Sequence, residues 1–137
     1  MRVIGFSFKQ IAVEKKKEID RNVKINTQID INEVSFPKLD LFPGKEITNF
    51  EYNFKILYED FAEVIFKGSI LGLIEDKKQF EELKKSWKLK KIADELRIPL
   101  MNVIFSRCNL KAMQLEEDLG LPAHLPGPRI SSPEKQE

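Results

Sequence analysis

The clearest pattern in the chain is an alternation of apolar and polar residues over 48–74. Every second residue between 50 and 58 is apolar, and this set consists of Phe50, Tyr52, Phe54, Ile56 and Tyr58. Because successive side chains of a β-strand point to opposite faces, this spacing places the whole set on one face. After Glu59 and Asp60 the chain returns through Val64, Phe66 and Ile70. The pattern predicts an antiparallel hairpin with an aromatic face.

Two further strands are predicted upstream of this hairpin. Over 3–15, the residues Ile4, Phe6 and Phe8 share one parity, whereas Ile11 and Val13 share the other. A change of parity inside one strand is what a β-bulge produces. Over 23–33 a set of apolar residues alternates with polar ones, which predicts a half-buried strand. The apolar set consists of Val23, Ile25, Ile29 and Ile31.

Proline and glycine mark the irregular positions of the predicted sheet. Residues 36–44 contain two prolines and a Pro-Gly pair. They predict a loop, because proline cannot donate to a sheet ladder and Pro-Gly favours a turn. Gly68 and Gly72 lie inside the strand predicted over 62–74, where glycine indicates a bulge or a close backbone contact.

From residue 76 onward the apolar period becomes helical. Asp76 is a predicted N-cap for a helix with Phe80, Leu83 and Trp87 on one face, and we expect this helix to break near 86–88. Pro99 is expected in the first turn of a second helix that ends at Gly120. Its apolar stripe comprises Met101, Ile104, Cys108, Ala112, Leu115 and Leu119. The proline-rich segment over 121–130 is expected to lie extended against the domain.

These elements predict an α+β fold, with a four-stranded antiparallel sheet in meander order followed by two C-terminal helices. A chain of 137 residues has the length of one domain. We therefore expect a single α+β domain over 1–130 and a disordered tail over 131–137.

Composition excludes several classes of site. The net charge is +1, so the overall field favours neither nucleic acid nor an acidic substrate. One cysteine and one histidine exclude an internal disulfide, a thiolate zinc cluster and a multi-histidine metal site, and no cofactor is expected. The chain shows no signal-peptide pattern, and its uncharged runs, such as the one over 68–74, are too short to cross a bilayer. We expect a cytoplasmic protein without membrane insertion.

Candidate chemistry is sparse. Cys108 and His124 would form a nucleophilic dyad if the C-terminal segment folds back over the second helix. Cys108 lies on the apolar stripe, however, where a buried structural thiol is the favoured interpretation. The acidic run over 116–118 is interpreted as a solvated face. We assign no catalytic residue and expect a protein that is not an enzyme.

A lysine-rich face of the first predicted helix offers a second candidate. It consists of Lys77, Lys84, Lys88 and Lys91. Such a stripe is able to hold the phosphates of a nucleic acid. Carboxylates at 81, 82, 94 and 95 interleave with it, which favours a solvated helix face.

The last predicted hairpin is apolar on both faces. Its second face carries Leu57, Ile65, Leu71 and Leu73. Two helices cover only one face of four long strands, so the other face must pack against something else, usually another subunit. This predicts a homo-oligomer, either a dimer or a tetramer.

The order of elements resembles the SecB-type protein-export chaperones. The likeness is strongest in the alternation up to Tyr58, the turn at 59–60, the glycine-containing strand over 62–74 and the ending over 120–130. The resemblance implies a SecB-like tetramer, built as a dimer of dimers, whose apolar grooves hold extended non-native polypeptide without ATP. The residues that we expect at such a groove or at a subunit interface are Phe6, Phe8, Phe42, Tyr52, Trp87 and Phe105.

The leading hypothesis is therefore an oligomeric, chaperone-like protein-binding module whose partner is non-native polypeptide or a single protein. Three alternatives remain open. They are a nucleic-acid-associated factor that uses the lysine face, a small-ligand-binding protein, and an enzyme that uses His124 with Cys108 or a nearby carboxylate. The leading hypothesis involves neither nucleic acid nor a membrane.

Overall fold

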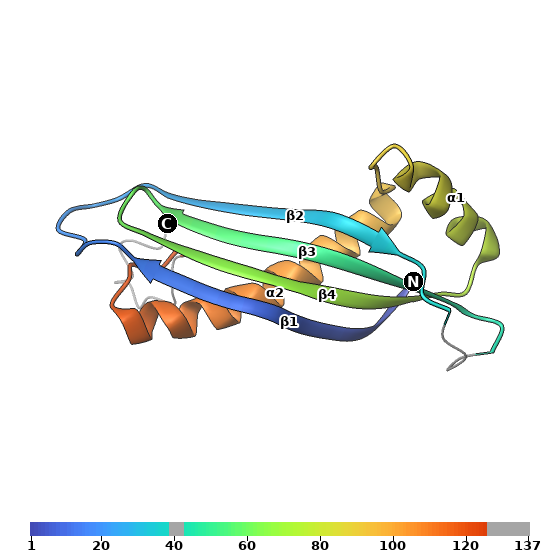
Figure 1. The fold of residues 1–137 in the computed structure, drawn as a ribbon, viewed down its shortest axis with the longest axis horizontal. Helices are drawn as coiled ribbons and strands as arrows, with labels where there is room; N and C mark the ends of the chain where they lie inside the picture. The colour runs from blue at the N-terminus through green and yellow to red at the C-terminus, as the bar shows by residue number, and fades with distance from the viewer. Residues whose placement is uncertain (39–42, 126–137) are drawn as a thin grey trace, which may run out of the picture.

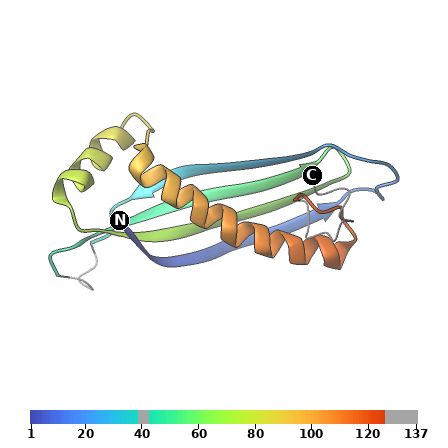
Figure 2. The same cartoon turned by 180° about the vertical axis from the view of Figure 1, so that it is seen from behind.

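The computed structural model describes residues 1–38 and 43–125 and has two layers, a sheet and a layer of helices on one of its faces (Figures 1 and 2). The strands are β1 (Arg2–Lys15), β2 (Ile25–Ser35), β3 (Glu46–Tyr58) and β4 (Ala62–Ile74). They are followed by the helices α1 (Lys77–Trp87) and α2 (Asp94–Leu119). The predicted fold class, a four-stranded antiparallel sheet followed by two C-terminal helices, is confirmed.

The predicted meander is correct for three strands and wrong for β1. The strand order is β1-β4-β3-β2, so β1 pairs with β4 and not with its neighbour in sequence. A tight hairpin turn would force β1 and β2 to be adjacent, whereas the connection over 16–24 is longer. It needs to span three strand spacings, about 14 Å, which a chain of this length easily covers.

The predicted bulge in β1 is confirmed. The pairing of β1 with β4 shifts register between Phe8 and Gln10, and also between Val3 and Gly5. The first shift lies where the apolar parity changes. As a result, Phe6, Phe8 and Val13 all lie on the same face of the sheet, which we call the inner face.

The inner face forms the core together with α2. The aromatic and aliphatic set of β3 from Phe50 to Tyr58 is almost fully buried, and it pairs with buried residues of β4, among them Val64, Phe66 and Ile70. The helix contributes a buried row at intervals of four residues: Leu96, Leu100, Ile104, Cys108, Ala112 and Glu116.

This row determines how α2 lies on the sheet. An α-helix has 3.6 residues per turn, so a row with steps of four residues rotates by about 40° per step around the axis. Because the buried row turns around the helix axis, its contacts with the sheet shift sideways from one turn to the next. This arrangement fits a helix that crosses the strands obliquely. In Figure 2, α2 begins over β2 and ends over β1. The predicted stripe is correct at Ile104, Cys108 and Ala112, but Leu119 is exposed because the buried row has rotated away from it.

The helix ends predicted at Asp76 and Gly120 are confirmed, whereas the predicted position of Pro99 is not. The Asp76 carboxylate caps α1 by accepting a hydrogen bond of 2.9 Å from the backbone N–H of Lys78, and Gly120 ends α2 with a φ of 66°. Pro99 was expected in the first turn of α2. The helix instead begins at Asp94, so Pro99 lies inside it.

The opposite face of the sheet is mixed in character. Leu57, Ile65 and Leu71 are only half-buried there, next to polar residues such as Asn53 and Lys55, whereas Leu73 is fully buried. The four apolar residues expected on the second face of the hairpin do lie there, interspersed with polar ones. The single domain over 1–130 stays a prediction, and the tail over 131–137 lies outside the described residues. Within the described residues, neither helix has the length and apolar character needed to cross a membrane.

Gly68 lets a side chain of β3 reach across β4. Tyr52 pairs with Gly68, and its hydroxyl donates a hydrogen bond of 3.2 Å to the backbone carbonyl of Ser7 in β1. A Cβ atom at position 68 would lie 2.5 Å from the Tyr52 hydroxyl oxygen and closer still to the Ser7 carbonyl oxygen. The predicted close contact at Gly68 is confirmed, and this contact ties three strands together.

We expect Gly68→Ala to lower the free energy of unfolding by about 1–3 kcal/mol, because an added methyl group has no room between two strands. Urea unfolding followed by circular dichroism measures this change. Gly5→Ala is the control, since a Cβ there would lie 3.5 Å from Leu71 and fit without strain. Equal effects of the two substitutions would contradict the prediction.

Candidate functional site

The oblique course of α2 leaves two corners of the inner face uncovered by the helix (Figures 1 and 2). One corner lies along the first half of β1, beside the middle of α2. The other lies at the opposite end of the sheet, where β2 begins and β3 ends. The first corner is an open groove, and the second is filled by the chain itself.

The open corner consists of two clefts that run into each other. A cleft of 590 Å³ is lined by Val3, Ile4, Gly5 and Phe6 of β1 and by Asn102, Val103, Ser106 and Arg107 of α2. A second cleft of 370 Å³ is lined by Phe6, Ser7, Phe8, Arg107, Leu110, Lys111 and Gln114. Since Phe6 and Arg107 line both, we describe the two clefts together as the β1–α2 groove.

The floor of the β1–α2 groove is a set of interlocked aromatic rings. Phe6 stacks on Tyr52 with a centroid distance of 5.3 Å, and Phe8 contacts the edge of Phe6 at 5.2 Å. Phe8 also packs on Phe66 at 5.5 Å. Burial raises the pKa of the Tyr52 hydroxyl above its ordinary value, so this group stays protonated and keeps donating to β1. The floor is apolar, and packing holds its shape.

The walls of the groove differ in character. On the helix side, Leu110 is 66% exposed, and the guanidinium of Arg107 lies 5.6 Å from the centre of the Phe6 ring. On the other side, β1 is an edge strand, which pairs with β4 along one edge and with no described strand along the other. Its outer backbone N–H and C=O groups are therefore able to pair with another extended chain.

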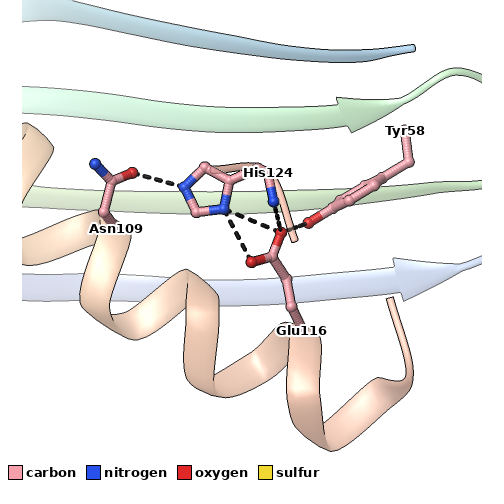
Figure 3. Close-up of polar contacts among 4 residues, drawn as sticks. All are labelled: Tyr58, Asn109, Glu116 and His124. Carbon is pink, nitrogen blue, oxygen red and sulfur yellow. Dashed lines mark hydrogen bonds and ion pairs between the residues drawn. The ribbon is translucent and has the colours of Figure 1, made fainter. Parts of the chain in front are cut away.

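The second corner is filled by the segment over 121–125, which buried polar groups hold in place (Figure 3). Glu116 accepts a short hydrogen bond from the Tyr58 hydroxyl and one of 2.9 Å from the backbone N–H of His124. The Nδ1 atom of His124 lies 2.9 Å from Glu116 Oε1, and its Nε2 atom lies 2.7 Å from Asn109 Oδ1. The His124 and Glu116 side chains are 0% and 4% exposed.

Both ring nitrogens of His124 have a polar partner, Glu116 on the Nδ1 side and Asn109 on the Nε2 side. Burial and the contact with Glu116 raise the pKa of Tyr58, so its hydroxyl remains a donor to the same carboxylate. The Tyr58 hydroxyl, the His124 ring and the His124 backbone N–H together surround the buried Glu116 carboxyl group. This arrangement fixes the C-terminal segment over the sheet, as expected from the sequence for its part over 121–125.

The interpretation of the run over 116–118 as a solvated face is wrong for Glu116. Glu117 and Asp118 are exposed, but Glu116 continues the buried row four residues after Ala112. The four-residue spacing from Ala112 to Glu116 is the feature of the sequence that indicates burial of Glu116. The interpretation missed it because it treated three adjacent carboxylates as one group.

The predicted site residues lie in several places. Phe6 and Phe8 line the β1–α2 groove, and Tyr52 lies beneath them. Phe105 is 42% exposed on α2 but does not line the groove, and Trp87 lies at the end of α1 with Lys90 over its ring. Phe42 lies outside the described residues.

Sequence reasoning missed the helix side of the groove. Val103, Arg107 and Leu110 follow one another at steps of four and three residues, so they share one face of α2. The spacing is visible in the sequence. Nothing in it says which face of the helix lies next to β1.

The structure gives little support to the two alternative sites, the Cys108–His124 dyad and the lysine face of α1. Cys108 is fully buried, burial raises the pKa of its thiol to about 12, and both ring nitrogens of His124 have other partners. The geometry thus does not support a nucleophilic dyad. On α1, the Lys84 ammonium lies over the rings of Phe36 and Phe80 at 5.6 and 4.5 Å, so this member of the lysine face packs on its own chain.

Comparison with known proteins identifies the fold. No family model matches the chain, and no curated protein matches it. A solved structure does match: the Mycobacterium tuberculosis Rv1957 SecB-like chaperone in complex with a ChAD peptide from the Rv1956 HigA1 antitoxin. The fold is SecB-like. The match has a TM-score of 0.53 and covers 96% of this chain and 91% of that chain. At 13% sequence identity it establishes the SecB-like fold, and the function has to be argued from the residues of the groove.

We expect Glu116→Ala to destabilise the protein by about 3 kcal/mol or more, because it leaves the Tyr58 hydroxyl, the His124 backbone N–H and the buried His124 ring without their partner. Urea unfolding measures the change. Glu117→Ala, the neighbouring exposed carboxylate, is the control and should stay within about 0.5 kcal/mol of the wild type. A similar small effect of both substitutions would show that the buried network does not stabilise the fold.

Proposed function

We propose that this chain is an oligomeric protein-binding module that holds extended polypeptide in the β1–α2 groove without ATP, as a chaperone does. The observation that carries the proposal is the open groove itself. It has an aromatic floor formed by Phe6 and Phe8 and lies beside the free edge of β1. An unfolded client offers the matching features, namely alternating apolar side chains and unpaired backbone groups.

The groove is suited to clients of varied sequence. Aromatic rings present large apolar surfaces that accept side chains of different shapes. The neutral polar residues along the helix side, Asn102, Ser106 and Gln114, are able to hydrogen-bond to a client backbone. The SecB-like neighbour was solved with a bound peptide, which supports peptide binding as a function of this fold.

An oligomer is supported by apolar residues of α2 outside the groove. Ile98 and Phe105, which lie two helical turns apart, are 50% and 42% exposed. Burying such a row against a second copy would remove it from water, in keeping with the dimer or tetramer that we propose.

The proposal is tested by size exclusion with light scattering, on the chain alone and with reduced, carboxymethylated α-lactalbumin as an unfolded client. We expect a mass of two or four copies and co-elution with the client. Leu110→Ser should weaken client binding about tenfold, because a leucine that a client covers contributes about 1.5–3 kcal/mol.

Met113→Ser provides the matched control. Met113 is an exposed apolar residue of the same helix, and it does not line the groove. Its substitution should leave client binding unchanged. A chain that stays monomeric at tens of micromolar and ignores the unfolded client would refute the proposed function.

A further inference from the structure

We infer that the β1–α2 groove selects extended segments in which an acidic residue lies between apolar ones, and that Arg107 binds the acidic side chain. The inference rests on the proposed function and specifies its partner. The juxtaposition behind it is a guanidinium in the middle of an apolar groove whose lining residues include no carboxylate.

The charged residues that line the groove are all positive. Its lining residues include Arg107 and Lys111 but neither Asp nor Glu, although the chain as a whole carries a net charge of only +1. In the described part of the chain, neither cation has a carboxylate within salt-bridge distance. By contrast, Arg21 and Arg97 pair with Glu59 and Asp94 at 3.0 and 2.8 Å. The groove thus presents positive charge to whatever occupies it.

Arg107 is well placed to meet a ligand. It lines both clefts, so any segment that fills the whole groove passes it. Its guanidinium rests over the Phe6 ring, which limits its motion and leaves N–H donors available at the edge of the plane. A guanidinium held in this way is suited to a carboxylate, which it binds through two parallel hydrogen bonds.

The spacing of the groove gives the pattern of the ligand. Apolar residues lie on both sides of Arg107, with Val3 and Val103 in the first cleft and Phe8 and Leu110 in the second. In an extended chain every second side chain points the same way, at intervals of about 6.6 Å. The matching segment therefore has an acidic residue with apolar residues two positions before and two positions after it.

A peptide fits this surface better than a nucleic acid does. Binding a phosphate backbone needs a row of cations along its path. The groove instead offers two cations above a floor of phenyl rings and aliphatic side chains. That combination matches a ligand with one charge among apolar groups.

The test compares three fluorescein-labelled peptides of one sequence, with leucine two positions before and after a central Asp, Asn or Lys. Fluorescence anisotropy at low salt measures their affinities. We expect the Asp peptide to bind about fivefold or more tightly than the Asn peptide, and the Lys peptide to bind weakest. Arg107→Gln should abolish the preference, Arg107→Lys should retain part of it, and Arg107→Glu should reverse it toward the Lys peptide.

Arg97→Gln is the matched control, because Arg97 is an exposed arginine of α2 outside the groove, and it should keep the wild-type preference.

Equal affinities of the wild type for the Asp and Lys peptides would overturn the inference, as would a preference that survives Arg107→Gln. So would binding of unfolded α-lactalbumin without binding of any peptide. In each case the proposed function stands if α-lactalbumin still binds and Leu110→Ser weakens it. If neither peptide nor α-lactalbumin binds, both proposals fail.

Discussion

The packing of α2 across the aromatic face of the sheet is the interaction on which the rest of the structure depends. A single helix has to cover the inner face of four strands, and it does so with a buried row at steps of four residues. Because that row rotates around the helix, its contacts follow an oblique path over the sheet. An oblique helix cannot cover a long rectangular sheet, so two corners of apolar surface remain.

The chain itself covers one of these two corners and leaves the other open. At one corner, the segment over 121–125 folds back and is held by a carboxylate with three protein donors: the Tyr58 hydroxyl, the His124 backbone N–H and the His124 ring. Buried polar groups of this kind require one geometry, because any displacement leaves a buried polar group without a partner. The chain thus closes this corner in a defined arrangement.

At the other corner, the apolar surface stays open beside an edge strand. The floor there does not collapse, because Tyr52 reaches over Gly68 to Ser7 and Phe6 stacks on Tyr52. An apolar groove with a fixed floor and a free backbone edge is suited to binding an extended chain. Arg107 adds a charge to this surface, which gives it a basis for choosing among clients as well as for holding them.

Local features of this fold could be predicted from the sequence because they follow from the geometry of a few neighbouring residues. The alternation from Phe50 to Tyr58 determined one face of β3, and the change of parity between Phe8 and Ile11 located the bulge in β1. Asp76 and Gly120 marked helix ends for the same reason, since capping involves only adjacent backbone groups. Phe6 and Phe8 of β1, which the sequence places at a groove or at a subunit interface, line the β1–α2 groove, and their role in binding stays a prediction.

Only the tertiary structure decided which distant parts of the chain meet. The choice of β4 as the partner of β1 depends on contacts such as Tyr52 with Ser7, and the place of α2 over β1 depends on contacts such as Lys15 with the Leu119 carbonyl at 3.1 Å. These contacts join residues far apart in the sequence, and no local period encodes them. The burial of Glu116 and the position of Arg107 at the groove follow from the oblique path of α2, which results from the packing of the whole sheet. The sequence by itself therefore determined the elements and their faces, whereas packing between distant segments determined the site.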